Sequence, residues 1–156
     1  MLPVRPGAVY GVENAQIGLQ LLAEQQSQGN WAAIIGLPEI GFAAAKYAGM
    51  DMNRTLVVPD PGARWAEVLA TFIDSVGVIA IRPPVVVRDY EAARIAARLR
   101  KRKVVLLSFG PWPRMEARFS FEHHGWLGIG NGHGFLQARE GIIKVHHRSG
   151  QVAKAG

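Results

Sequence analysis

Val78-Ile79-Ala80-Ile81, followed by Arg82-Pro83-Pro84, is the stretch that decides the fold. An unbroken apolar run of this length is typical of a parallel strand that is covered on both faces, and the two prolines prevent the strand from continuing. A parallel strand reaches its neighbours through long crossover connections, which are usually helices. Helical segments are therefore expected on both sides of this run in the sequence.

Segments with the patterns of strands and helices do alternate around it. Apolar, β-branched runs predict strands, and apolar residues three and four positions apart predict helices. The expected strands cover 8–11, 31–36, 54–58 and 104–109, and the expected helices cover 13–28, 38–49, 65–73 and 90–102. Strands that alternate with helices imply right-handed crossovers. We expect an α/β fold with a mainly parallel sheet and helices on both faces.

The last third of the sequence has a different pattern. Apolar and polar residues alternate over 118–122, 135–139 and, more loosely, 142–146, and Glu140-Gly141 between the last two is a hairpin signal. These segments predict an antiparallel extension at one side of the sheet. The residues after Ser149 have the composition of a flexible tail. The expected organisation is a single domain over 1–150 and a flexible tail over 151–156.

Composition and charge narrow the class of protein. The chain has 156 residues, of which 49% are hydrophobic and 19% charged, with no cysteine and a formal net charge of +6. Its most apolar stretches end well before the roughly 20 residues that cross a bilayer, and its first residues lack the pattern of a signal peptide. We expect a cytoplasmic protein without membrane contact. The basic balance favours an acidic partner, either nucleic acid or an acidic protein surface.

The order of elements resembles the ATP-binding core of the RecA recombinase family. The similarity is clearest from Val9 to Ile81 and weaker beyond it. The matching positions are Val9-Tyr10-Gly11, Leu19-Gln20-Leu21-Leu22-Ala23, Gln26 with Gly29, Ala45-Lys46 with Gly49-Met50-Asp51, Leu56 with Pro59-Asp60, and Val78-Ile79-Ala80-Ile81. The resemblance implies a RecA-like fold.

The phosphate-binding loop of that family departs from its pattern here. A Walker A loop needs Gly-x-x-x-x-Gly-Lys-Thr/Ser, because its backbone and lysine hold the phosphates and its hydroxyl holds Mg²⁺. Counted forward from Gly11, Ile17 stands at the lysine position and Gly18 at the hydroxyl position. Counted back from Gly29, the loop is shorter than in the family. By either count the lysine and the hydroxyl are absent.

Two further parts of the ATPase also depart from the pattern. Arg82 stands where the strand 78–81 should end in a carboxylate that orders Mg²⁺. The catalytic acid expected after Ile34-Ile35 falls near Leu37, with Glu39 close by. We therefore expect no ATP hydrolysis and no bound cofactor, and an interaction module in place of an enzyme.

Among RecA-like proteins without a Walker motif, the chain resembles the ImuA family of the bacterial DNA-damage mutagenesis cassette, especially its actinobacterial type. The resemblance rests on Gly125–Gly130, Gly134–Arg139 and Val145–Arg148. It implies an accessory protein of SOS-induced translesion synthesis that binds an inactive Y-family polymerase homologue, ImuB, with DNA contact as an open question. A second similarity is to the SulA-like division inhibitors, which bind the tubulin-like division protein. Only about seven residues precede the first strand, so a RecA-type filament is not expected.

The densest charge lies on and after the helix that begins near Tyr90. Its members are Arg94, Arg98, Arg100, Lys101, Arg102 and Lys103. Arg94 and Arg98 share one helix face, and the last four residues bunch at the helix carboxyl end, where cations interact well with the dipole. The cluster is either a solvated helix end, a protein-binding patch or a phosphate contact.

A second candidate surface is the loop Gly110-Pro111-Trp112-Pro113-Arg114-Met115. Prolines on both sides hold Trp112 in an extended loop, which suits an anchor for a partner's pocket. Arg114 and Arg118 would add backbone contacts to a nucleic acid. The alternative is that the loop is a lid over the sheet.

Other chemistry has less support in the sequence. Five histidines, His123, His124, His133, His146 and His147, fall in the last third. Adjacent histidines on a strand point to opposite faces, so neither pair chelates one ion easily, and we expect no metal site. If the chain were an enzyme that reuses the cleft at the strand ends for another small ligand, Glu39, Arg82 and His133 would be its first candidate residues.

Overall fold

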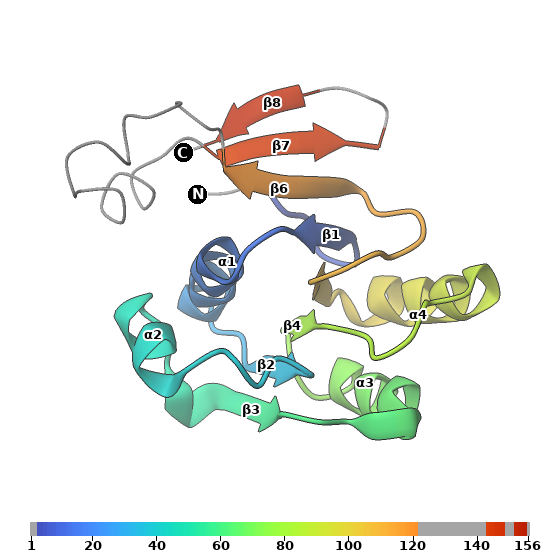
Figure 1. The fold of residues 1–156 in the computed structure, drawn as a ribbon, viewed down its shortest axis with the longest axis horizontal. Helices are drawn as coiled ribbons and strands as arrows, with labels where there is room; N and C mark the ends of the chain where they lie inside the picture. Colours follow the sequence, from blue (N-terminus) through green and yellow to red (C-terminus); the bar gives the residue numbers. More distant parts are fainter. Residues whose placement is uncertain (1–2, 122–142, 149–151, 156) are drawn as a thin grey trace.

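A computed structural model of the chain describes residues 3–121, 143–148 and 152–155, and it places one sheet between two layers of helices (Figure 1). The strands are β1 (Val9–Val12), β2 (Ala32–Ile35), β3 (Thr55–Val58), β4 (Val78–Ile81), β5 (Val105–Ser108), β6 (Ala117–Phe121), β7 (Ile143–His147) and β8 (Val152–Ala155). The helices are α1 (Ala15–Ser27), α2 (Phe42–Tyr47), α3 (Trp65–Ile73) and α4 (Asp89–Arg102), with short 3-10 helices at Met52–Arg54 and Gly62–Arg64.

The strands follow the order β3-β2-β4-β5-β1-β6-β7-β8. All pairs from β3 to β6 are parallel, whereas β7 runs antiparallel to both β6 and β8. The first strand of the chain therefore lies inside the sheet, between β5 and β6. The predicted α/β class, with a mainly parallel sheet and an antiparallel extension at its carboxyl-terminal side, is confirmed.

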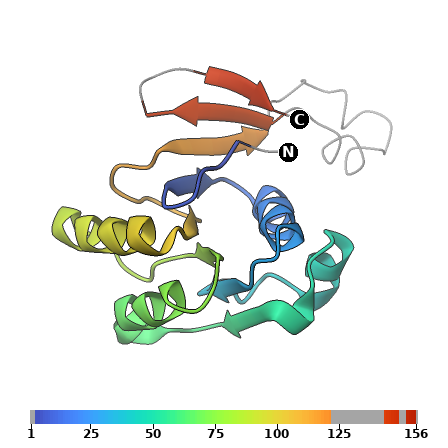
Figure 2. The same ribbon diagram turned by 180° about the vertical axis from the view of Figure 1, so that it is seen from behind.

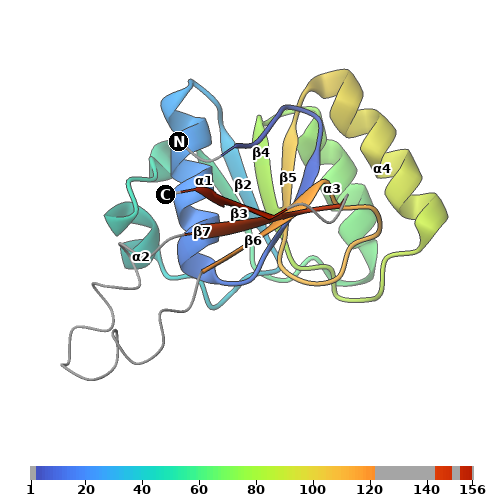
Figure 3. The same ribbon diagram turned by 90° about the horizontal axis from the view of Figure 1, so that it is seen from above.

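Helices cover both faces of the parallel strands. Figure 3 shows α1 and α2 on one side of the sheet and α3 and α4 on the other, and Figure 2 shows the same layers from behind. Successive strand residues point to opposite faces, so Tyr10 packs with α1 while Val9 packs with α3 and α4. This two-sided covering explains why β2, β4 and β5 read as unbroken apolar runs: all their residues are buried.

The antiparallel extension is apolar on one face. Ala117 and Phe119 of β6 and Ile143 and Val145 of β7 are buried in the cluster that includes α1. The residues between them are polar, and the Ser120 hydroxyl lies 3.3 Å from His146 Nε2. The extension thus continues the α1 side of the core.

One sequence prediction at the carboxyl terminus was wrong. Residues 152–155 form β8, with Val152 in register with His146 and Ala155 with Ile143, whereas the sequence predicted a flexible tail over 151–156. A short strand of this kind is held by its partner β7, and its own composition gives little signal. The strand expected at 135–139 and the hairpin signal at Glu140-Gly141 lie outside the described residues.

The connection from β5 to β6 contains no helix. It runs over residues 109–116, and its Trp112 is only 5% exposed, packed among the α3 and α4 side chains. The Trp112 and Trp65 rings meet edge to face with centroids 6.3 Å apart. Trp112 therefore ties this connection to the core on the α3 and α4 side of the sheet.

Candidate functional site

The connection between β1 and α1 is two residues long. β1 ends at Val12 and α1 begins at Ala15, so only Glu13 and Asn14 lie between them. The Asn14 side chain accepts a hydrogen bond from the Ile17 amide at 2.9 Å and caps the helix. A cradle of successive amides around a phosphate needs a longer loop. This connection has neither that length nor a lysine, serine or threonine.

The first turns of α1 are packed against an aromatic ring. A Cβ added at Gly18 would lie 2.3 Å from Phe109 Cζ, so the helix backbone rests directly on this ring at the end of β5. Phe109 is 6% exposed and belongs to the α1-side core. A protein side chain thus fills the space beside the amino-terminal half of α1.

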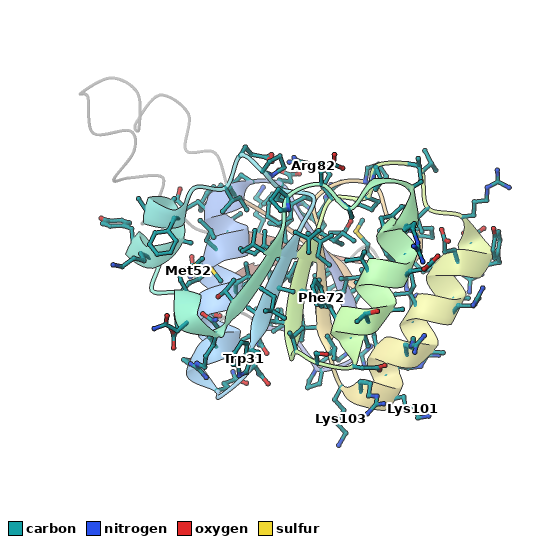
Figure 4. The ribbon with its side chains drawn as sticks, turned by 90° about the horizontal axis from the view of Figure 1, so that it is seen from below. Trp31, Met52, Phe72, Arg82, Lys101 and Lys103 are labelled. Carbon is teal, nitrogen blue, oxygen red and sulfur yellow. The ribbon has the colours of Figure 1, made fainter. Side chains whose placement is uncertain are left out.

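Arg82, which directly follows β4 (Figure 4), forms an ion pair with Glu39. Arg82 Nη1 donates to Glu39 Oε1 at 2.8 Å and also contacts Oε2. These hydrogen bonds lower the pKa of Glu39 below its usual value, so this carboxylate is a poorer proton acceptor than a free glutamate. Of the three residues named for an enzyme, the structure brings Arg82 and Glu39 together, and His133 lies outside the described residues.

A cleft of about 770 Å³ opens at the carboxyl ends of the parallel strands. Its walls come from the end of β1, from Arg82, from the connection after β5 and from Arg118 of β6, and its lining is Gly11, Val12, Glu13, Arg82, Ser108, Phe109, Gly110, Pro111, Trp112, Met115 and Arg118. Arg118 Nε lies 3.7 Å from Glu13 Oε1 across the β1–β6 pair. Glu13 could not be recognised from the sequence, because only the β1–β6 register brings it to Arg118.

The three predicted residues of the 110–118 region have different surroundings. Trp112 is buried in the protein's own core, an arrangement that fits the lid alternative better than an exposed anchor; its contact with a partner stays a prediction. Arg114 is exposed at a positive φ of 58°. Arg118 is exposed at the cleft. A tryptophan between prolines gave no sign of whether its ring points outward or inward.

The predicted basic cluster occupies the exposed face and carboxyl end of α4. Asp74, which follows α3, pairs with two of its members, Arg102 at 3.1 Å and Arg98 at 3.6 Å. The other four, Arg94, Arg100, Lys101 and Lys103, are exposed and take part in no ion pair within the described residues. Lys103 ends the helix in the left-handed conformation, with φ 59°.

The two candidate surfaces lie at opposite ends of the strands. Figure 4 shows Arg82 at the end where the parallel strands finish, and Lys101 and Lys103 at the end where they start. We call these the carboxyl end and the amino end of the sheet. The basic cluster and the cleft are therefore separate surfaces, and one small ligand does not reach both.

The structure describes only part of the segment that holds the five histidines. His146 and His147 lie on β7, and His123, His124 and His133 fall outside the described residues. Among residues 3–121, 143–148 and 152–155, no three His, Cys, Asp or Glu side chains are grouped as ligands of one ion. In the same ranges, no helix is long and apolar enough to cross a membrane.

These features define an α/β protein with a mixed sheet, a two-residue connection between β1 and α1, and a basic helix end. The chain belongs to the family of the MT3502 N-terminal domain, whose model matches residues 1–114. That match runs from β1 to β5 and ends before β6. The chain is also 33% identical over 118 residues to the uncharacterized protein Rv3395c of Mycobacterium tuberculosis (strain ATCC 25618 / H37Rv). The matched region covers 74% of this chain and 58% of that relative.

Proposed function

We propose that the chain is a non-catalytic, RecA-like interaction module that serves SOS-induced translesion DNA synthesis. In this role it binds an inactive Y-family polymerase homologue of the ImuB kind in the cytoplasm. The observation that carries the proposal is the two-residue connection between β1 and α1, at the position where the RecA family holds its phosphates. A RecA-like domain that keeps its sheet and helix layers but lacks this loop cannot hold the phosphates of ATP. We therefore propose that it acts by binding.

Two contacts support the absence of ATPase chemistry. Phe109 packs on Gly18 beside the start of α1, so a phosphate there would have to displace an aromatic ring. Arg82 replaces the metal-ordering carboxylate and is paired with Glu39. Mg²⁺ takes oxygen ligands, and a guanidinium in this position repels the ion.

The amino end of the sheet is the surface that best fits a macromolecular partner. Arg100, Lys101 and Lys103 have no ion pair within the described residues, and the carboxyl end of α4 adds its partial negative charge without using up their charge. Pairing such cations with an acidic partner speeds association and favours the correct partner. A protein partner is the primary proposal for this cluster, with DNA phosphates as the second candidate.

The proposal is tested by affinity capture from DNA-damaged cells with two matched variants. The first carries Arg100→Ala, Lys101→Ala and Lys103→Ala. The control carries Lys46→Ala, Arg64→Ala and Arg88→Ala, which removes the same number of charges from exposed positions elsewhere. We expect the polymerase homologue to be captured by the original protein and by the control, and to be lost with the first variant.

Other outcomes separate the alternatives. Capture of the tubulin-like division protein, with filamentous cells on overexpression and unchanged induced mutagenesis on deletion, supports a SulA-like inhibitor and contradicts the proposal. ATP hydrolysis by the purified protein that a substitution at Asn14 abolishes would contradict every non-catalytic alternative. Equal loss of capture in both variants would show that net charge, and not this surface, carries the binding.

A further inference from the structure

The cleft at the carboxyl end of the sheet has two arginines that use little of their hydrogen-bonding capacity on other described residues. A guanidinium carries five N–H donors. Arg82 uses Nη1 alone on Glu39. The 3.7 Å contact between Arg118 Nε and Glu13 is too long for a hydrogen bond, and within the described residues no group accepts a hydrogen bond from Arg118. Both side chains line the same cleft.

The charge of the lining sets the charge of a matching ligand. Arg82 and Arg118 contribute two positive charges, which Glu13 in the lining and Glu39 beside the cleft offset. A single carboxylate adds one negative charge to this set and can still accept from the guanidinium N–H groups that these carboxylates leave open. A phosphate dianion or a triphosphate would add more negative charge, and Glu13 would repel it further.

The remaining walls are apolar and fixed. Phe109, Trp112 and Met115 line the cleft with Pro111, and Trp112 is held from below by Trp65. The Ser108 hydroxyl donates to the Gly110 carbonyl at 3.0 Å and secures the start of the loop. Small-molecule sites of about 300–1,000 Å³ combine such apolar walls with a few placed polar groups, and the volume of about 770 Å³ lies in this range.

Gly11 keeps the charged and apolar parts of the cleft together. It is in register with Arg118 across the β1–β6 pair. A Cβ at Gly11 would lie 2.6 Å from Met115 Sδ and 3.1 Å from Arg118 Cγ. Both side chains therefore depend on the missing side chain of Gly11 for their positions.

We propose that this cleft binds a carboxylate attached to an apolar body, with Arg118 and Arg82 on the carboxylate and the Trp112 loop against the apolar part. The source of that chemistry is either a free organic acid or the carboxyl terminus of a protein chain that ends in a large apolar residue. This inference is independent of the proposed function, because it concerns the opposite end of the sheet from the basic cluster.

The test is a titration of the full-length protein followed by ¹⁵N–¹H NMR of the Trp112 indole and the Arg118 Nε–H. The probes are indole-3-propionate, its neutral amide, inorganic phosphate, and a hexapeptide ending in Leu-Trp with either a free or an amidated carboxyl terminus. We expect saturable shifts of both signals with at least one free carboxylate. The corresponding amide should bind at least about tenfold more weakly, because a charge-assisted hydrogen bond is lost.

Two variants make the test specific. Arg118→Gln should weaken binding of the carboxylate about tenfold or more. Arg114→Gln removes the same charge from an exposed residue of the neighbouring 109–116 connection that is not part of the cleft lining, so it should leave binding unchanged. Both positions are exposed, and both variants are expected to fold.

The outcomes are distinct. Binding of indole-3-propionate alone assigns the site to a small organic acid, and binding of the free peptide alone assigns it to a chain terminus; both support the proposal. It is overturned if no carboxylate shifts the signals, if acid and amide bind equally, if phosphate binds more tightly, or if Arg114→Gln weakens binding as much as Arg118→Gln. None of these results changes the capture experiment, so the two proposals fail separately.

Discussion

The carboxyl end and the amino end of the sheet differ in how many of their charged side chains are paired. At the carboxyl end, Arg82 and Arg118 each face one carboxylate, and the connections around them are packed by Phe109 and Trp112. At the amino end, Asp74 forms ion pairs with Arg98 and Arg102. The other cations at the end of α4 have no ion pair within the described ranges.

The two ends of the sheet are expected to contribute differently to stability and to partner binding. In open α/β sheets the carboxyl ends of the strands are the usual ligand site. Here that end has a short first connection and a buried aromatic cover, and the unpaired charge lies at the other end. Substitutions of the packed residues at the carboxyl end should therefore cost stability, whereas substitutions of the exposed cations at the amino end should cost capture of the partner.

The largest effect is expected at Trp112. Trp112→Ala should lower the free energy of unfolding by about 3–5 kcal/mol, because it leaves a cavity in the α3 and α4 side of the core. Urea unfolding measures it. Trp31→Ala is the control and should cost less than half as much, since Trp31 is 44% exposed. Equal costs would mean that the Trp112 ring is not a core residue.

A smaller effect is expected where α1 meets β5. Gly18→Ala places a Cβ 2.3 Å from Phe109 Cζ, and such overpacking costs about 1–3 kcal/mol. In a Phe109→Leu background the added methyl group has more room, so the same substitution should cost less there. Unfolding of the four proteins of this cycle gives the coupling energy. Additive effects would show that helix and ring are not in contact.

The cap of the short β1–α1 connection should contribute less again. Asn14→Ala removes the acceptor for the Ile17 amide and should cost about 1 kcal/mol of stability. Asn14→Asp keeps an acceptor at the same position and should retain most of it. Thermal unfolding measures the loss of stability in both variants. An Asn14→Ala protein as stable as the original would contradict the helix cap formed by Asn14.

The smallest effect on stability is expected at the amino end. Arg100→Ala, Lys101→Ala and Lys103→Ala should each change the free energy of unfolding by at most about 0.5 kcal/mol, as for exposed residues without a special role. Circular dichroism in urea measures this directly. A large loss would make the basic cluster part of the fold, and any loss of partner capture would then have a structural cause.

Much of the fold could be predicted from the sequence, because the pattern of apolar residues in each segment matches the burial of that segment in the folded protein. Unbroken apolar runs such as Val78–Ile81 occur where both faces of the sheet are covered, and the amphipathic segments between them became α1, α3 and α4. The order of the strands in the sheet could not be predicted. Nothing in Val9–Val12 indicates that its neighbours are β5 and β6, since pairing depends on residues far away in the chain.

The candidate sites were predicted less well, for the same reason. Local charge density identified the end of α4, because a run of cations is visible in sequence. The orientation of Trp112 was not visible, because it depends on the absence of a helix between β5 and β6. The Arg118–Glu13 contact likewise needs the register between β1 and β6.

The interior position of β1 also has a consequence for folding. Val9 is in register with Leu106, and Tyr10 with Ala117, so both described strands that pair with β1 are synthesised much later than β1. Contacts of such long sequence separation slow folding, because the loop must close before they form. During translation β1 therefore lacks its neighbouring strands until β5 has left the ribosome, whereas α1 can already pack on β2 and β4.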